Sequence, residues 1–190
     1  MKACRPDPPA WAEHLDSVAG AGIRGPHLPA DPPPSLLRPA RNGETPERTL
    51  RSAASAGAVP DSGCLDLDTV GPLWSADRWS AIEVWTEGEL CGLHALARLR
   101  RLRVDEAGAI ARRLRSAIEW HLEHTQPDNA THRPWAVHLF LGHPEPEVDL
   151  YGQTLLHNFE AAGRGDPDAA WILRDSAREI RLDPAVARRW

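Results

Sequence analysis

Histidine is the residue type through which this sequence could most readily do chemistry. His121 and His124 are three positions apart, which places them on neighbouring positions of one helix face. An imidazole can act as a general acid or base, and it can ligate zinc or iron. The alternative is that both histidines bond to carbonyl groups or water at a helix end, where their charge suits the helix dipole. The histidines within or beside apolar helical stretches are His94, His121, His124, His132, His138 and His157.

Carboxylates near these histidines suggest an acid–base site. Glu87 and His94 are seven positions apart and near one side of a helix, and together with His121 they could serve a hydrolase or lyase. Glu83 would join that side only if the helix began before it. No nucleophile elbow, phosphate-binding loop, dinucleotide fingerprint or HExxH motif accompanies them. We therefore predict Glu87, His94 and His121 as candidate catalytic residues, with capping and surface charge as the alternative, and we expect no cofactor and no metal ligand set.

The stretch HTQPDNATHRPW, residues 124–135, lies between two apolar helical runs. Its histidines, amides and tryptophan could bind a ligand, and Trp side chains can stack on sugars or bases. The alternative is a helix stop at Pro127, followed by a helix capped by Thr131 or Asn129 with Pro134 in its first turn. The candidate ligand-binding residues come from this stretch, its preceding tryptophan and a later helix: Trp120, His124, Asp128, Asn129, Trp135, His157 and Asn158.

These residues must be positioned by helices. Thr86 and Glu89 match a capping box, which predicts a helix start at Thr86. The next helix, after Asp105, carries an apolar stripe at i, i+3, i+4 spacing that includes His121. A third helix opens at Pro134 and should be central, because PWAVHLFLG is apolar on nearly every side. A fourth covers PEVDLYGQTLLHNFEAAG, where His157 and Asn158 need polar partners. The last two predicted helices begin at Asp-Pro pairs: DPDAAWILRDSAREIRL and DPAVARRW.

The chain divides into two unequal parts by composition. Most of its 18 prolines lie in residues 1–75, where apolar residues follow neither a helical nor a strand period over any length. Such a segment buries too little apolar surface to offset its ordering entropy, so we predict that it is mostly disordered. Two exceptions are a short helix in PAWAEHLDSVAG and an extended piece in SGCLDLDTVGPLW. Residues 76–190 are predicted to form an all-helical domain, in which short connections favour antiparallel helical hairpins.

The helical part resembles the hairpin units of α/α-toroid proteins over about residues 79–180. The resemblance rests on a small-residue helix, an arginine-rich amphipathic helix and the connection Gln126-Pro127-Asp128-Asn129, with Asn where Gly is common in those proteins. It implies a partial toroid or a solenoid-like array of helical hairpins, and a concave face. A complete toroid has about six hairpins and this chain has room for two or three, so it would be a fragment, a partial arc or an oligomerising unit. The resemblance carries over no catalytic residue.

Overall composition narrows the partners. A net charge of −5 and a pI near 6.0 give no support for nucleic-acid binding through bulk charge. The N-terminal residues lack the apolar core of a signal peptide, and no run is long enough to span a bilayer. Three scattered cysteines do not make a disulfide framework. We expect a cytoplasmic protein without membrane contact, whose partner is another protein or a second copy of itself.

Two classes of function follow. The first is a non-catalytic helical-hairpin scaffold for protein interactions, favoured by amphipathic helices with short loops, the Pro-rich segment and no recognised catalytic motif. The second is an enzyme or small-ligand binder with a site built from histidine, glutamate and asparagine side chains. A histidine-ligated metal protein is a further alternative, which requires an imidazole nitrogen within about 2.1 Å of the metal.

Overall fold

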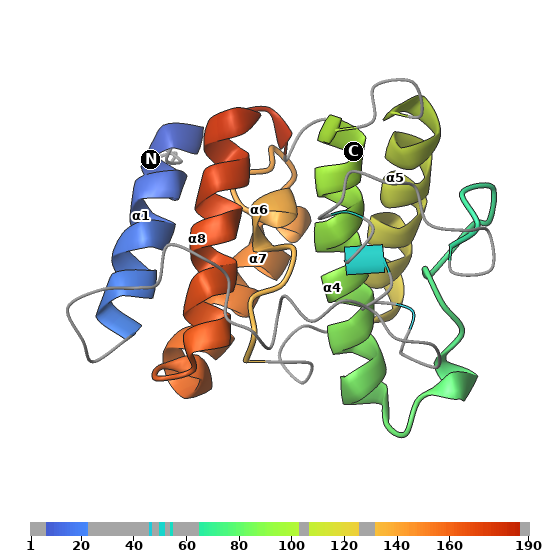
Figure 1. Ribbon diagram of the computed structural model, residues 1–190, viewed down its shortest axis with the longest axis horizontal. Coiled ribbons are helices and arrows are strands. Elements are labelled where there is room, and N and C mark those ends of the chain that lie inside the picture. Colours follow the sequence, from blue (N-terminus) through green and yellow to red (C-terminus); the bar gives the residue numbers. More distant parts are fainter. Residues whose placement is uncertain are drawn as a thin grey trace. The chain divides into compact units, whose positions relative to one another are not determined.

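A computed structural model describes residues 7–22, 46, 50–51, 54, 65–102, 107–125 and 132–186. The chain forms two compact units, each described by itself below. The first unit contains residues 7–22 and 132–186, and the second contains the described residues between 46 and 125. Within these ranges the regular elements are helices and no strand occurs, which confirms the predicted all-α class (Figure 1).

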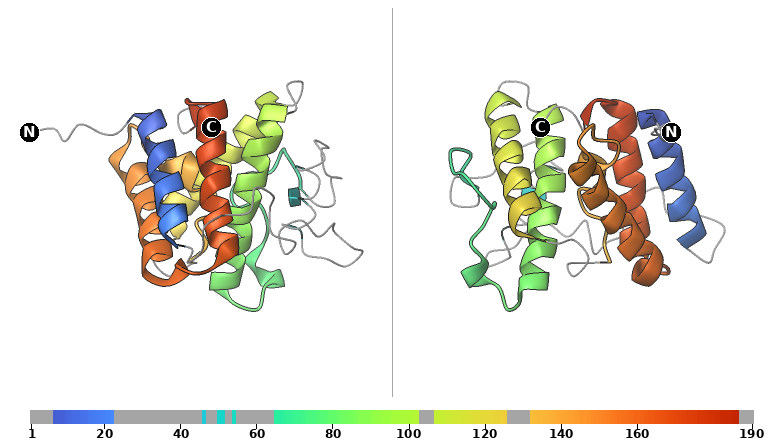
Figure 2. Two further views of the ribbon diagram at one scale, coloured as in Figure 1. Left: turned by 60° about the vertical axis from the view of Figure 1, so that its left-hand side comes forward. Right: turned by 180° about the vertical axis from the view of Figure 1, so that it is seen from behind.

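The second unit is a helical hairpin. Its arms are α4, Ile82–Leu102, and α5, Ala107–His124, which lie side by side in the views of Figures 1 and 2. The predicted stripe of α5 is confirmed, because Ile110, Leu114 and Ile118 are each 0% exposed. The arms are antiparallel, as expected for consecutive helices joined by a short connection. The hairpin thereby sets residues near the middle of α4 against residues near the end of α5.

The start of α4 differs from the prediction. The helix begins at Ile82, and the hydroxyl of Thr86 donates to the carbonyl of Ile82 within the first turn at 2.9 Å. Glu89 does not complete a capping box, because its carboxylate is 0% exposed and accepts hydrogen bonds from backbone N–H groups outside the helix. The pattern predicted that Glu89 lies in the first turn of a solvated helix end, whereas it is buried within α4 and bonds to the strap. The capping-box interpretation was therefore wrong.

A segment without regular secondary structure packs against this hairpin. We call residues 65–75 the strap; it runs into the short 3-10 helix η1, Ala76–Arg78. Leu65, Leu73 and Trp74 of the strap are buried. Gly92 of α4 permits this packing, because a Cβ atom there would lie 2.5 Å from the Trp74 ring. The sequence predicted a short extended piece here, and the strap instead contains bends at several residues and a left-handed backbone at Gly71.

The first unit is built around α8, Pro167–Leu182. Beside it lies α1, Pro8–Gly22, as the views in Figures 1 and 2 agree. Arg181, near the end of α8, contacts Asp16 and the carbonyl of Ala12, so the two helices are antiparallel. Asp166 caps α8 as predicted, since its side chain accepts from the N–H of Asp168 at 2.8 Å.

The remaining helices of this unit are shorter. They are α6, Val137–Phe140, and α7, Pro146–Asn158, which continues as a π-helical turn, η3, Phe159–Gly163. The predicted helix at Pro134 was placed too early, because Ala136 has a left-handed backbone with φ of 56° and the helix starts after it. The stretch is nonetheless central, as predicted, since the residues from Pro134 to Leu141 are all buried.

Two stretches before residue 75 belong to these packed units. In α1, Ala12, Leu15 and Ala19 are each 0% exposed and form the stripe that faces the rest of the unit, and the strap packs on the hairpin. Most of the other residues in 1–75 lie outside the described residues, so the domain boundary at residue 75 stays a prediction. No helix in the described part of the chain is long and apolar enough to cross a membrane.

Candidate functional site

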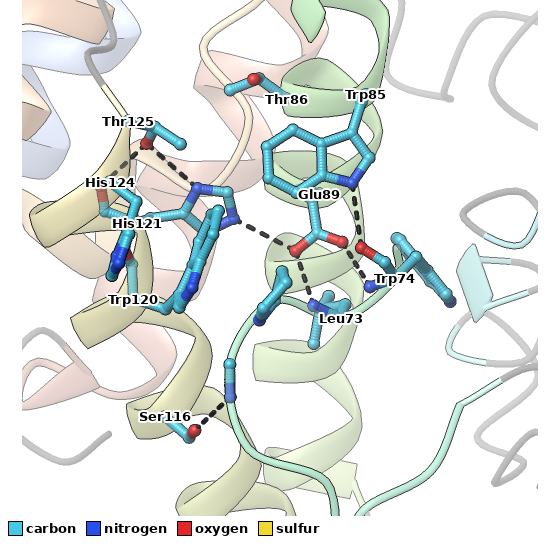
Figure 3. A network of polar contacts seen from close by, with 12 residues as sticks. Leu73, Trp74, Trp85, Thr86, Glu89, Ser116, Trp120, His121, His124 and Thr125 are labelled. Atoms are coloured by element: carbon cyan, nitrogen blue, oxygen red, sulfur yellow. Dashed lines mark hydrogen bonds and ion pairs between the residues drawn. The ribbon is translucent and has the colours of Figure 1, made fainter. Parts of the chain in front are cut away.

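The most concentrated polar chemistry of the second unit is a buried carboxylate–imidazole pair. Nε2 of His121 on α5 lies 3.1 Å from Oε2 of Glu89 on α4, and both side chains are 0% exposed (Figure 3). The same carboxylate accepts from two strap N–H groups, that of Leu73 at 2.7 Å and that of Trp74 at 2.6 Å. Glu89 therefore ties both arms of the hairpin to the strap.

The other nitrogen of His121 is also occupied. Nδ1 lies 3.1 Å from the hydroxyl oxygen of Thr125, whose own proton goes to the His121 carbonyl at 2.8 Å. That hydroxyl must therefore accept from Nδ1–H, while Nε2 faces a carboxylate. Each ring nitrogen of His121 thus has an oxygen partner within hydrogen-bond distance. We call Glu89, His121, Thr125 and the two strap N–H groups the Glu89–His121 network.

A second buried cation holds the other part of the strap. Arg113 on α5 is 1% exposed, and its guanidinium donates to three backbone carbonyls, those of Asp66, Gly71 and Pro72. Desolvation by burial lowers the pKa of Arg113, and the negative charges of Glu89 and Asp66 oppose that shift. Ser116, one turn further along α5, accepts from the N–H of Gly71 at 2.9 Å. The strap is fastened through its main chain.

A groove opens beside the fastened strap. Its volume is about 580 Å³, and one side is formed by strap and η1 residues. Two exposed apolar side chains border it, Val70 at 87% and Ile82 at 57% exposure. We call it the strap groove; its lining residues are Thr69, Val70, Pro72, Leu73, Trp74, Ser75, Ala76, Asp77, Ile82, Trp85 and Trp120.

Tryptophans form the aromatic side of the strap groove. Trp85 is 1% exposed and donates from Nε1 to the Trp74 carbonyl at 3.0 Å. Trp120 is half-buried and meets Trp85 edge to face, with ring centroids 5.5 Å apart. The exposed ring of His124 stacks on Trp120 at 4.6 Å with an interplanar angle of 5°. Figure 3 shows these rings beside the Glu89–His121 network. Trp120 is thus held from two sides and still reaches the groove.

Of the predicted catalytic residues, the structure brings only His121 into this network. The carboxylate that meets His121 is Glu89, and Glu87 lies about 200° away from it around α4. The earlier start of α4 does place Glu83, Glu87, Leu90 and His94 along one side of the helix. Glu87 is half-buried and His94 is buried. A catalytic role for Glu87, His94 and His121 stays a prediction.

The predicted ligand-binding residues fall into separate places. Trp120 and His124 stack together at the strap groove. Asp128 and Asn129, with the rest of residues 126–131, lie outside the described residues. The other three belong to the first unit, where Trp135 is buried, Asn158 is half-buried and His157 is exposed. The expected placement of His157 inside an apolar helix was therefore wrong, because its position falls on the solvent face of α7.

Sequence reasoning missed two residues of the site, Glu89 and Arg113. Glu89 matched a local capping pattern, which concealed its distant partners. Arg113 carried a usable signal, since it is three residues after buried Ile110 and four before buried Ala117. A lone arginine on an apolar stripe indicates a buried cation. Among the described residues no group of three or more His, Cys, Asp or Glu side chains could hold a metal ion.

Comparison with known proteins returned no family model, no curated protein and no solved structure that matches this chain. The resemblance to α/α-toroid hairpins stays a prediction.

Proposed function

We propose that this chain is a non-catalytic interaction protein that binds a partner in the strap groove. The observation that carries the proposal is the strap groove itself, in which the half-buried Trp120 lies beside the exposed apolar side chains of Val70 and Ile82. Exposed apolar patches of this kind mark sites of association, and Trp residues often contribute much of the binding energy at interfaces.

The buried Glu89–His121 pair supports a binding role over a catalytic one. Glu89 and His121 are 0% exposed, and their carboxylate and ring nitrogens are engaged with each other, Thr125 and the strap. A general acid or base must reach the proton that it transfers, within hydrogen-bond distance or through one water molecule. This pair is arranged to hold the strap, and the strap forms one side of the groove.

Site-specific photocrosslinking tests the proposal. Benzoylphenylalanine in place of Val70, in cells that naturally make the chain, should give an adduct of defined mass. The same residue in place of Leu150, which is 63% exposed in the first unit, is the matched control. The adduct should disappear when Ile82→Ser is added. Equal adducts at both positions, or none at Val70, would contradict binding in the strap groove.

Turnover offers an independent test of the non-catalytic part of the proposal. Hydrolysis of ester, amide or phosphate substrates by the purified chain should be no faster than hydrolysis by its Glu89→Gln variant. Glu89→Gln keeps the side-chain shape while it removes the charge, so circular dichroism would show whether the helices persist. Turnover that is lost in this variant while the fold is kept would overturn the proposal in favour of an enzyme.

We also propose that the protein acts in the cytoplasm. The cysteine pattern supports this location, because three scattered cysteines do not make the disulfide framework that is common in small secreted domains. Fractionation of cells that carry the natural gene, with detection by an antibody, tests the location. Recovery in a membrane or extracellular fraction would contradict it.

A further inference from the structure

One acidic side chain lines the strap groove, and three more lie close to lining residues along the chain. Asp77 is an exposed lining residue, and Asp68 is exposed beside Thr69 of the lining. On the helices, exposed Glu83 follows Ile82, and Glu123 lies one turn beyond Trp120 with its side chain 76% exposed. Among the side chains that the structure describes, no lysine or arginine lines the groove. The lining is therefore mostly apolar, and we call the four carboxylates in it or near its residues along the chain the rim.

This pattern distinguishes between classes of occupant. An acidic rim repels the phosphates of a nucleic acid, whose binding depends on basic side chains. It also disfavours a symmetric dimer in which two copies pair groove to groove, because the two acidic rims would face and repel each other. A segment with apolar and basic side chains has the complementary chemistry. Its apolar side chain would contact Trp120, Val70 and Ile82, and its cationic side chains would reach the rim.

We propose that the strap groove binds a peptide segment of another protein that carries a large apolar side chain flanked by lysine or arginine. This inference rests on the proposed function and adds the chemical class of the partner. The volume of about 580 Å³ falls within the range of pockets that enclose compact ligands. The groove therefore suits one or two anchoring side chains, with the flanking charges left near solvent.

Selection from a random-peptide display library tests the inference with the full chain as bait. Enriched peptides should combine Leu, Ile, Phe or Trp with Lys or Arg within a few positions. A fluorescein-labelled synthetic copy of the most enriched peptide is then titrated by fluorescence anisotropy at low and high salt. Its affinity should fall as salt rises, because the rim charges are exposed and screened.

Three variants locate the binding and its chemistry. Trp120→Ala should weaken binding of that peptide by about tenfold or more. The double variant Val70→Ser/Ile82→Ser should weaken it strongly as well, and it changes only exposed side chains, so it guards against a folding defect in the first variant. The triple variant Asp77→Asn/Glu83→Gln/Glu123→Gln should weaken it about threefold or more and remove most of the salt dependence. The matched control is Leu150→Ser/Leu182→Ser, which removes exposed apolar side chains of the first unit.

The outcomes separate this inference from the proposed function. Enrichment of basic–apolar peptides whose binding follows these variants supports both. Peptides that bind the groove but are acidic or uncharged overturn the partner class and leave the proposed function standing. A dimer that forms in solution and is lost in Val70→Ser/Ile82→Ser assigns the groove to a second copy and overturns the inference. Peptides that bind every groove variant as tightly as the parent chain, or no enrichment at all, overturn both the inference and the proposed function.

Discussion

The two units hold their loops with the same kind of group in different surroundings. In the second unit, Glu89 is buried against His121 and binds the strap through two backbone N–H groups. In the first unit, Asp149 accepts from the N–H of Gly142 at 2.7 Å and from Nε2 of Gln153 at 2.7 Å. Glu89 thus faces a buried imidazole, whereas Asp149 accepts from a neutral amide on its own helix.

This difference shows where each unit is vulnerable. Loss of the Glu89 carboxylate strands a buried imidazole and two buried N–H groups at once. Loss of the Asp149 carboxylate strands one half-buried N–H and one amide that can turn to water. A buried polar contact is costly to break because water cannot reach the group that loses its partner. The second unit therefore depends more on a single carboxylate than the first unit does.

The largest effect is expected from Glu89→Ala. This change should lower the free energy of unfolding by about 3–5 kcal/mol, because it removes the buried partner of Nε2 of His121 and of two strap N–H groups. Asp149→Ala should lower it by about 1.5–3 kcal/mol, as for a hydrogen bond to a charged group. Urea unfolding followed by Trp fluorescence measures both. The double variant Glu89→Ala/His121→Ala should lose much less than the sum of its single changes, and an additive result would show that the pair is not coupled.

Close helix packing gives the next contrast, between two glycines. A Cβ at Gly152 of α7 would lie 2.8 Å from the backbone nitrogen of Leu141, which cannot move aside, so Gly152→Ala should destabilise by about 1–3 kcal/mol. A Cβ at Gly88 of α4 would lie 2.3 Å from the far end of the Trp79 ring, which is half-buried and can turn away. Gly88→Ala should therefore be nearly neutral, since alanine also favours the helix. Thermal unfolding compares them, and the reverse order would contradict this account.

A smaller effect is expected from Thr125→Val. The change keeps the side-chain shape and removes the acceptor for Nδ1–H of His121. Because Thr125 is half-buried, water can partly replace the hydroxyl, so the loss should be about 1 kcal/mol. Thr154→Val on α7 is the matched control, since the exposed Thr154 hydroxyl contacts only the Leu150 carbonyl at 2.9 Å. Equal losses in the two variants would show that Thr125 contributes nothing through His121.

The smallest effect concerns Asp166 at the start of α8. Burial opposes its ionisation, but hydrogen bonds from Arg133 and from the N–H groups of Asp168 and Ala169 outweigh it and hold the pKa of Asp166 below its ordinary value of 3.8. A lowered folded-state pKa contributes stability above that value, and the contribution is lost as the pH falls through the folded pKa. Asp166→Asn keeps the cap and should lose less than about 1 kcal/mol near neutral pH. The difference in the free energy of unfolding between this variant and the parent chain should vanish in acid. Urea titrations at several pH values measure it, and a difference that persists in acid would contradict the assigned cause.

Features that depend on neighbours in sequence could be predicted for this chain. The apolar stripe of α5 and the Asp-Pro start of α8 are both encoded within one or two helical turns, and both are confirmed. The role of Glu89 could not be predicted this way. Its partners lie 15 and 16 residues earlier and 32 residues later, and they meet only when the hairpin closes on the strap. Thr86 and Glu89 match the capping-box pattern, but the helix starts at Ile82 and not at Thr86.

The start of α6 failed for a different reason. Pro134 fits the first turn of a helix, but Ala136 adopts a left-handed backbone conformation that residues other than glycine rarely adopt. Nothing in the alanine side chain announces that conformation, because the surrounding packing imposes it. Arg113 is the opposite case, since its place on an apolar stripe was visible in the sequence and its burial could have been inferred.

The strap is gripped by its main chain, and this has a consequence for sequence change. Arg113, Ser116 and Glu89 bond to backbone atoms of the strap, whatever side chains those residues carry. Exposed positions such as 68 and 70 are therefore free to vary without releasing the segment. The arrangement is that of an antibody loop on its framework, in which a fixed scaffold displays changeable contacts. Randomising these positions should yield grooves of new specificity on an unchanged hairpin, which makes this small domain a candidate scaffold for designed binders.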